Sequence, residues 1–143
     1  FASVYGINFL NKDKRVDEII DIFNFHDIQD MKSQDLPLGF KQRLSLACAV
    51  IHNPPILFLD EPTSGVDVIA RREFWNHITS LAKLGVTILV TTHFMDEAEY
   101  CNRISLFYKG ETIALGTPYE LKTKAKADNM EQAFVNLIKE SGK

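Results

Sequence analysis

Two adjacent carboxylates, Asp60 and Glu61, are the residues of this 143-residue sequence best placed to do chemistry. They directly follow the apolar run Ile56–Leu59, which suits a strand buried on both faces of a parallel sheet. Ligands of open α/β sheets bind at the carboxyl ends of the strands, where these acids are expected to lie. Neighbouring carboxylates repel each other, and a cation relieves that repulsion. We therefore expect one acid to hold Mg²⁺ and the other to act on a water molecule.

The residues after the acids form a distinctive loop. Pro62 disfavours helical geometry at Glu61, so the chain must turn out of the sheet there. The loop continues through Thr63, Ser64 and Gly65 to Asp67, which can cap the helix that follows. The plain alternative is a core strand that ends in solvated acids. A strand followed by an acid is common, but the whole run from Asp60 to Asp67 is far rarer.

Apolar spacing predicts helices and strands in alternation, which is typical of an α/β domain with a parallel sheet. Asp13 and Asp128 are predicted N-caps, and Thr117 with Glu120 is a predicted capping box. The predicted helices are 13–23, 40–51, 68–84, 95–101, a helix from Pro118, and 129–140; the predicted strands are 56–59, 86–90, 103–108 and 112–115.

Composition is that of a globular domain, with 45% apolar and 24% charged residues. The net charge of −3 gives no indication of nucleic-acid binding. No apolar run approaches the ~18 residues of a membrane span. If the protein acts at a membrane, we expect it to act from the membrane surface. Cys48 and Cys101 have no metal-like spacing and are predicted to be free, buried thiols.

A histidine, His93, follows the second predicted strand. Parallel strands end at the same edge of a sheet, so His93 is expected to emerge near Asp60 and Glu61. A lone histidine is more often structural, and His26, His52 and His77 are interpreted in that way.

The run Asp-Glu-Pro-Thr-Ser-Gly-Val-Asp, residues 60–67, resembles the magnesium-binding strand and following loop of the ATP-binding cassette (ABC) ATPases. The resemblance implies that Asp60 holds the magnesium of Mg-ATP and that Glu61 is the general base. It also implies that His93 contacts the γ-phosphate, and that Asp67 is a cofactor-binding residue in a loop that crosses the dimer interface and couples the two ATP sites. Phosphoryl transfer requires charge neutralisation and an in-line nucleophile, which these roles provide.

Residues 36–44 occupy the place of the family's signature motif, usually Leu-Ser-Gly-Gly-Gln followed by Lys/Arg-Gln-Arg. Leu36, Gly39 and the run 41–43 agree with it, whereas Pro37, Leu38 and Phe40 differ. In the family this loop opens a helix whose N-terminus binds the ATP of the opposite subunit. We assign Leu36, Gly39 and Phe40 to that nucleotide contact, which can persist through amides near Gly39 without the serine.

No Gly-x-x-x-x-Gly-Lys-Ser/Thr sequence occurs in the chain. The resemblance therefore implies a P-loop NTPase-like α/β fold, a parallel sheet with flanking helices, that is truncated and lacks the phosphate-loop strand. That strand would lie between the strand before His93 and strand 103–108, so its absence exposes edges and favours self-association. The start, Phe1–Gly6, looks like the end of a cut helix. The implied parts are the remainder of a helical subdomain (1–52, with the signature loop at 36–44), an ATPase core (53–115) and C-terminal helices (116–143).

The tail, 116–122 and 130–135, resembles the ending of exporter ATPases, and the run from Thr91 to Glu99 resembles bacterial multidrug exporters. The resemblance implies an ATP-hydrolysing subunit of an ABC transporter, exporting drugs or other hydrophobic substrates. Its implied partners are a second ATPase domain and transmembrane permease subunits at the cytoplasmic face of the cell membrane. The chain alone is expected to be inactive. Two alternatives stay open: a non-transport ABC ATPase, which would need a basic face or coiled-coil insertions, and a non-catalytic interaction module.

Overall fold

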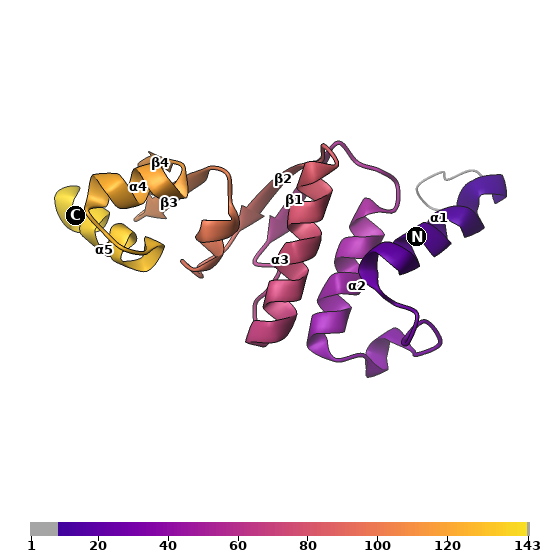
Figure 1. Cartoon of the computed structure of the whole chain (residues 1–143). Coiled ribbons are helices and arrows are strands. Elements are labelled where there is room, and N and C mark those ends of the chain that lie inside the picture. The colour runs from indigo at the N-terminus through magenta and orange to yellow at the C-terminus, as the bar shows by residue number, and fades with distance from the viewer. Residues whose placement is uncertain (1–8, 143) are drawn as a thin grey trace. The chain divides into compact units, whose positions relative to one another are not determined.

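The computed structural model describes residues 9–142, with side chains described from residue 13 (Figure 1). The expected helix end at Phe1–Gly6 lies outside the described residues. The chain divides into two compact units, the first ending at Thr91 and the second beginning at Thr92. Each unit has its own hydrophobic core, and each is described by itself.

The described residues of the first unit form a short parallel sheet and a set of helices. The elements in chain order are α1 (Phe9–Phe23), a 3₁₀ turn η1 (Ser33–Asp35), α2 (Leu38–Val50), β1 (Ile56–Asp60), α3 (Val68–Lys83) and β2 (Thr87–Thr91). Helix α3 contacts strand β2, α2 contacts α3, and α1 contacts α2. The register of the two strands pairs Ile56 with Thr87 and Asp60 with Thr91. The parallel pairing predicted from the apolar strands is confirmed.

The ends of the helices follow local signals. Helix α3 begins where Asp67 caps it and ends before Gly85, whose φ of +94° suits glycine alone. The prediction that Asp13 caps the first helix is wrong, because α1 already begins at Phe9. Residues 9–12 include Leu10 and Lys12, which have high helix propensity, so the helix begins earlier than predicted.

The core of the first unit lies between its three helices and the sheet. Helix α3 buries a stripe along one side, as its 3.6-residue period requires. The largest buried side chains from the other helices include Phe23 and Leu46. The buried stripe of α3 consists of Phe74, Trp75, Ile78 and Leu81.

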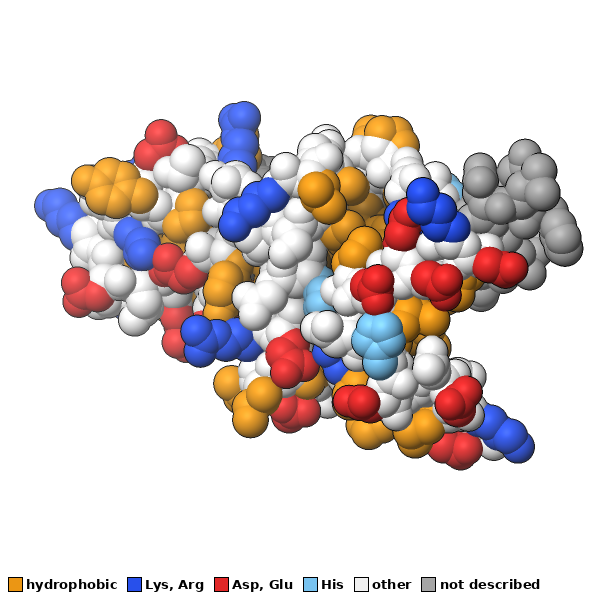
Figure 2. Space-filling model, turned by 45° about the vertical axis from the view of Figure 1, so that its right-hand side comes forward, with side chains coloured by type: hydrophobic (Ala, Val, Ile, Leu, Met, Phe, Trp, Pro, Cys, Tyr) orange, Lys and Arg blue, Asp and Glu red, His pale blue; other side chains and the backbone are white. Residues whose placement is uncertain are grey.

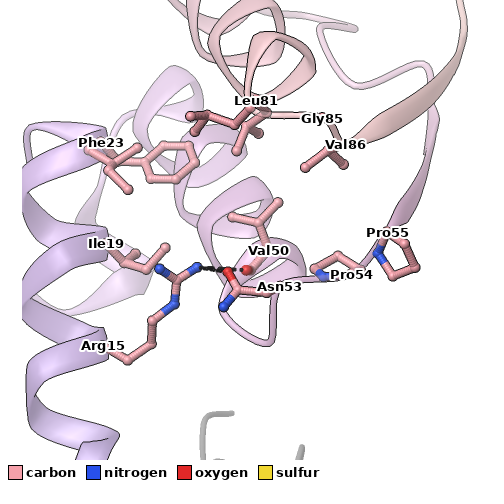
Figure 3. Close-up of a pocket in the computed structure, with 12 residues that line it drawn as sticks. Arg15, Ile19, Phe23, Val50, Asn53, Pro54, Pro55, Leu81, Gly85 and Val86 are labelled. Carbon is pink, nitrogen blue, oxygen red and sulfur yellow. Dashed lines mark hydrogen bonds between the residues drawn. The ribbon is translucent and has the colours of Figure 1, made fainter.

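Arg15 joins α1 to the end of α2. Its Nε donates to the carbonyl oxygen of Ile51 at 2.9 Å, and its Nη2 donates to that of Val50 at 3.1 Å and to the side chain of Asn53. The last carbonyls of a helix have no partner within it, so the guanidinium satisfies groups that would otherwise face solvent. Arg15, Val50 and Asn53 border an open pocket of about 360 Å³ whose other walls are apolar, including Leu81 and Val86 (Figure 3).

The surface from α1 to η1 is acidic. Figure 2 shows red acidic side chains gathered over this region. The exposed or half-exposed acids are Asp13, Asp17, Glu18, Asp21, Asp27, Asp30 and Asp35. Lys14, Arg15 and Lys32 are the basic residues between them, so this face carries net negative charge.

The prediction that β1 is buried on both faces is wrong. Leu57 is buried, but Phe58 is 72% exposed, and Ile56 and the neighbouring Leu89 of β2 are also exposed. Successive side chains of a strand point to opposite faces, and the described helices of this unit pack on the face of Leu57. The other face therefore presents apolar side chains to solvent.

The second unit is an antiparallel hairpin packed against two helices. Its described elements are a 3₁₀ turn η2 (Glu97–Tyr100), β3 (Ile104–Tyr108), β4 (Glu111–Gly116), α4 (Pro118–Ala125) and α5 (Met130–Glu140). Lys109 and Gly110 both have positive φ, as a tight hairpin turn requires. The core cluster includes Leu106, Leu121, Met130 and Leu137.

The helix caps of the second unit are partly as expected. Thr117 and Glu120 form the predicted capping box, with the Glu120 amide 3.2 Å from Thr117 Oγ1. The prediction that Asp128 caps the last helix is wrong, because Asn129 accepts the amide of Gln132 at 2.8 Å. Gln132 in turn accepts the amide of Asp128, the residue before the N-cap.

Both cysteines are free thiols, as predicted, and each is half-buried. Burial raises the pKa of each thiol, and the nearby Glu97 carboxylate adds to the effect at Cys101. Within residues 9–142 no helix is long and apolar enough to cross a membrane.

We predict that the first unit loses stability when His77 becomes protonated. His77 stacks on Phe23 with ring centroids 4.7 Å apart. Burial lowers the pKa of His77, Arg43 lowers it further, and Glu73 opposes them. The unfolded chain therefore binds more protons than the folded chain between the lowered pKa and about 6.5, and stability rises with pH across that interval.

The free energy of unfolding should accordingly fall as the pH drops below about 6.5. Trp75, the single tryptophan and a buried residue, reports the unfolding of this unit by fluorescence. His77→Gln should flatten the slope of stability against pH, whereas His52→Gln, at an exposed histidine, should not. An unchanged slope in His77→Gln would contradict the assignment.

Candidate functional site

The acidic pair lies at the carboxyl end of β1, as predicted. Asp60 is the last residue of the strand, and Glu61 has a φ of +47°, which is uncommon outside glycine. The Glu61 carbonyl then accepts the Ser64 amide at 3.1 Å, and the Thr63 carbonyl accepts the Val66 amide at 3.1 Å. The chain thus leaves the sheet abruptly at Glu61 through two successive turns, and strained backbone of this kind is concentrated at functional sites.

Thr91 is a site residue that the sequence analysis did not single out. Its hydroxyl donates a hydrogen bond to Asp60 Oδ1 and accepts the Glu61 amide, with nitrogen and oxygen 3.2 Å apart. The Thr91 carbonyl accepts the same amide at 3.0 Å. The sequence does contain a signal for this contact, because a hydroxyl at the end of a second parallel strand can reach an acid at the end of the first.

The two carboxylates suit a magnesium ion that keeps much of its water. Asp60 is exposed and Glu61 is half-buried, so both can reach a solvated ligand. The described residues contain no cluster of three or more His, Cys, Asp or Glu side chains that could enclose a metal ion. Magnesium is typically held by one or two carboxylates together with water and phosphate oxygens, and this donor set fits that pattern.

The loop after the acids ends at a capped helix. Asp67 Oδ1 accepts the amides of Ile69 and Ala70, each at 3.0 Å. The first two residues of α3, Val68 and Ile69, are 77% and 75% exposed. Asp67 therefore anchors the start of α3, and the helix presents an apolar first turn to its surroundings.

The signature region opens α2 but is packed differently from a glycine-rich phosphate cradle. Leu36 is buried, and Pro37 precedes the helix without a side-chain cap. A Cβ atom added at Gly39 would lie only 2.6 Å from the Cβ of Ala70. A Cβ at Gly65 would lie 3.3 Å from Leu38 Cδ2. The start of α2 thus rests against the loop and helix that follow the acidic pair, and Gly39 is required by that close approach.

Phe40, which replaces the family's glutamine, is held by Arg43. The guanidinium carbon of Arg43 lies 4.2 Å from the centroid of the Phe40 ring, within the range of a cation–π interaction. Arg43 is only 7% exposed, and its Nη1 lies 3.3 Å from Glu73 Oε2 on α3. Phe40 therefore belongs to a contact between α2 and α3.

His93 lies in the second unit, shortly after the end of β2. It is exposed, and its ring centroid lies 4.1 Å from that of Phe94, whose amide donates to Thr92 Oγ1 at 3.1 Å. Its expected position beside the acidic pair stays a prediction. Among the other predicted site residues, the structure brings Gly39 close to the loop that contains Asp67, and it joins Asp60 and Glu61 through Thr91.

The acids lie at the carboxyl end of a parallel strand, where open α/β sheets bind their ligands, and comparisons with known proteins identify the relatives of this chain. Residues 2–64 match the family model described as ABC transporter. The probable multidrug ABC transporter ATP-binding protein YbhF of Escherichia coli is 52% identical over 143 residues, covering 96% of this chain and 25% of that protein. Nod factor export ATP-binding protein I of Cupriavidus metallidurans is 38% identical over 122 residues, covering 85% of this chain and 40% of that protein.

Solved structures show the same fold. The structure of an ATP-binding subunit of an ABC transporter superposes with a TM-score of 0.77 at 24% identity, covering 96% of this chain and 58% of that chain. The structure of cbiO1 from Clostridium perfringens, part of the ABC transporter complex cbiONQ, gives 0.73 at 29% identity, covering 80% of this chain and 46% of that chain. The chain is thus similar to ATP-binding proteins of the ABC transporter family, and it spans about a quarter of the length of the first curated relatives that it matches.

We predict that Gly39→Ala destabilises the first unit by about 1–3 kcal/mol, the usual cost of overpacking. Helix propensity alone favours alanine over glycine, so a loss of stability would show that contact with Ala70 dominates. The measurement is denaturant unfolding followed by Trp75 fluorescence.

The double variant Gly39→Ala/Ala70→Gly removes the clashing atom and provides the control. It should be more stable than the sum of the two single variants predicts, because the two positions are in contact. Additive effects would contradict the packing explanation of Gly39.

Proposed function

We propose that this chain contributes the water-activating part of the ATP site of an ABC ATPase domain. The observation that carries the proposal is the position of Asp60 and Glu61 at the carboxyl end of β1, in a chain related to ABC ATP-binding proteins. Asp60 is proposed to hold the magnesium of Mg-ATP, and Glu61 to accept a proton from the attacking water. His93 is proposed to contact the γ-phosphate and to orient that water.

In this proposal, the residues of the chain position the metal ion and accept a proton from the attacking water. Magnesium, when bound with ATP, neutralises charge on the phosphates. The chain turns out of the sheet at Glu61, directly after Asp60, and we assign the metal to the Asp60 carboxylate and the role of base to that of Glu61. Thr91 donates a hydrogen bond to Asp60 and accepts one from the Glu61 amide, and these contacts support this division of roles.

A second ATPase domain is the proposed partner. The N-terminus of α2, with Leu36, Gly39 and Phe40, would contact the ATP bound by that domain through amides and the helix dipole. Asp67 would lie at the interface between the domains. The exposed apolar side chains of Val68 and Ile69 support an interface there, since surface this apolar is normally covered by a partner.

Export across a membrane is the proposed process. One relative is named as a multidrug ABC transporter ATP-binding protein and another as a Nod factor export ATP-binding protein. By analogy, this domain would work with transmembrane permease subunits at the cytoplasmic face of the cell membrane and drive the export of drugs or other hydrophobic substrates. We assign residues 1–52 to the helical subdomain, 53–115 to the ATPase core and 116–143 to C-terminal helices.

A non-catalytic interaction module is the second candidate for the 143-residue chain by itself. The sequence contains no Gly-x-x-x-x-Gly-Lys-Ser/Thr loop, which grips the phosphates in P-loop ATPases. The exposed apolar face of β1 and β2, with Ile56, Phe58 and Leu89, favours self-association. A non-transport ABC ATPase has less support, because the named relatives are transporter components.

We predict that the chain alone binds Mg-ATP weakly or not at all. The acidic pair contacts the metal and the γ-phosphate end, so most of the binding energy would have to come from a phosphate loop. Isothermal calorimetry should give no micromolar binding for the unchanged chain or for Asp60→Asn. Micromolar binding that is lost in Asp60→Asn would contradict this prediction.

We also predict that Glu61→Gln abolishes turnover but retains ATP binding in a polypeptide that joins this sequence to a phosphate loop. Loss of a general base typically costs 10²–10⁴-fold in rate. Glu131→Gln, at an exposed position in α5, is the matched control and should leave turnover unchanged. The measurement is phosphate release together with nucleotide retention, and unchanged turnover in Glu61→Gln would reject the base assignment.

A further inference from the structure

Thr91 makes hydrogen bonds with both members of the acidic pair. The parallel register places Thr91 directly opposite Asp60, and paired residues of neighbouring strands lie on the same face of the sheet. The short distance between them lets the Thr91 hydroxyl donate to Asp60 Oδ1. The same oxygen accepts the Glu61 amide at 3.2 Å.

This hydroxyl is constrained by both of its contacts. A hydroxyl has one hydrogen to donate, and here it goes to Asp60, while a lone pair accepts the amide of Glu61. The donated bond fixes one carboxylate oxygen of Asp60 and leaves Oδ2 free to turn toward a ligand. The accepted bond, with the bond to the Thr91 carbonyl, secures the backbone at Glu61, where φ is +47°.

We infer that Thr91 is a positioning residue that orients Asp60 for magnesium and holds Glu61 in its strained turn. The inference rests on the proposed function, because it assigns a role relative to the metal held by Asp60. Hydrogen-bond partners of metal ligands fix the direction of the ligating atom, and their loss typically lowers metal affinity 10–100-fold. A hydroxyl is required at this position, and the methyl group of threonine is not.

The test measures metal binding without nucleotide. Mn²⁺ alone is titrated into the ¹⁵N-labelled full chain, and the paramagnetic broadening of the amide signals of residues 60, 61 and 91 gives an apparent Kd. Thr91→Val, a near-isostere without the hydroxyl, should weaken Mn²⁺ binding about 10–100-fold. Thr91→Ser, which keeps the hydroxyl, should bind close to the unchanged chain, and Thr91→Ala gives a second variant without it.

Thr87→Val is the matched control. Thr87 lies on the same strand and the same face as Thr91, but at the other end and opposite Ile56. The Thr87→Val variant should leave the Kd for Mn²⁺ unchanged. Unfolding followed by Trp75 fluorescence checks that each variant folds. As a readout without metal, hydrogen exchange of the Glu61 amide should be faster in Thr91→Val than in Thr91→Ser.

The outcomes separate this inference from the proposed function. The role of Thr91 is overturned if Thr91→Val binds Mn²⁺ as well as the unchanged chain, or if Thr87→Val weakens binding equally. In that case, loss of Mn²⁺ binding in Asp60→Asn would still support the metal site at Asp60. The metal assignment of Asp60 is wrong if the unchanged chain shows no local broadening, or if Asp60→Asn binds Mn²⁺ as well as the unchanged chain. The inference about Thr91 would then be wrong as well.

Discussion

The parallel register of β1 and β2 is the constraint on which the candidate site depends. It places the ends of both strands together, so that Asp60 pairs with Thr91 and the chain turns at Glu61 beside them. A shift of one residue would move Thr91 to the other face of the sheet and break its bond to Asp60. Helix α3, which joins the two strands, is fixed at its start by Asp67 and therefore helps to maintain this register.

The packing of α2 against α3 explains why an altered signature sequence can keep its place in the fold. A serine and a glutamine of the family motif are replaced by Pro37 and Phe40. Phe40 makes a cation–π contact with the buried Arg43, which forms an ion pair with Glu73 of α3. Gly39 permits the close approach to Ala70. The local position of the loop is thus held by packing, although the hydroxyl of the usual serine is lost and one amide donor is removed by proline.

Much of the secondary structure and the location of the acids followed from the sequence, because each rests on a local signal. The apolar run before Asp60, the Asp67 cap and the capping box at Thr117 all depend on neighbours in the chain. Burial of Phe58 did not follow, because it depends on whether another element covers that face of the sheet. The contacts of Thr91, and of Gly39 with Ala70, join positions about 30 residues apart, and sequence spacing within an element carries no information about them.

Each unit leaves one face of its strands uncovered. Phe58 and Leu89 are exposed in the first unit, and Phe107 and Leu115 are exposed in the second. Burial of one such side chain is worth about 1.5–3 kcal/mol, so covering both faces would add stability comparable with that of a small domain. Additional protein that covers the sheet of the first unit would also restrict solvent around the edge that carries Asp60 and Glu61. Electrostatic interactions strengthen where water is excluded. The exposed apolar face and the edge that carries the two carboxylates belong to the same sheet, so protein that covered this face would also strengthen electrostatic interactions at that edge.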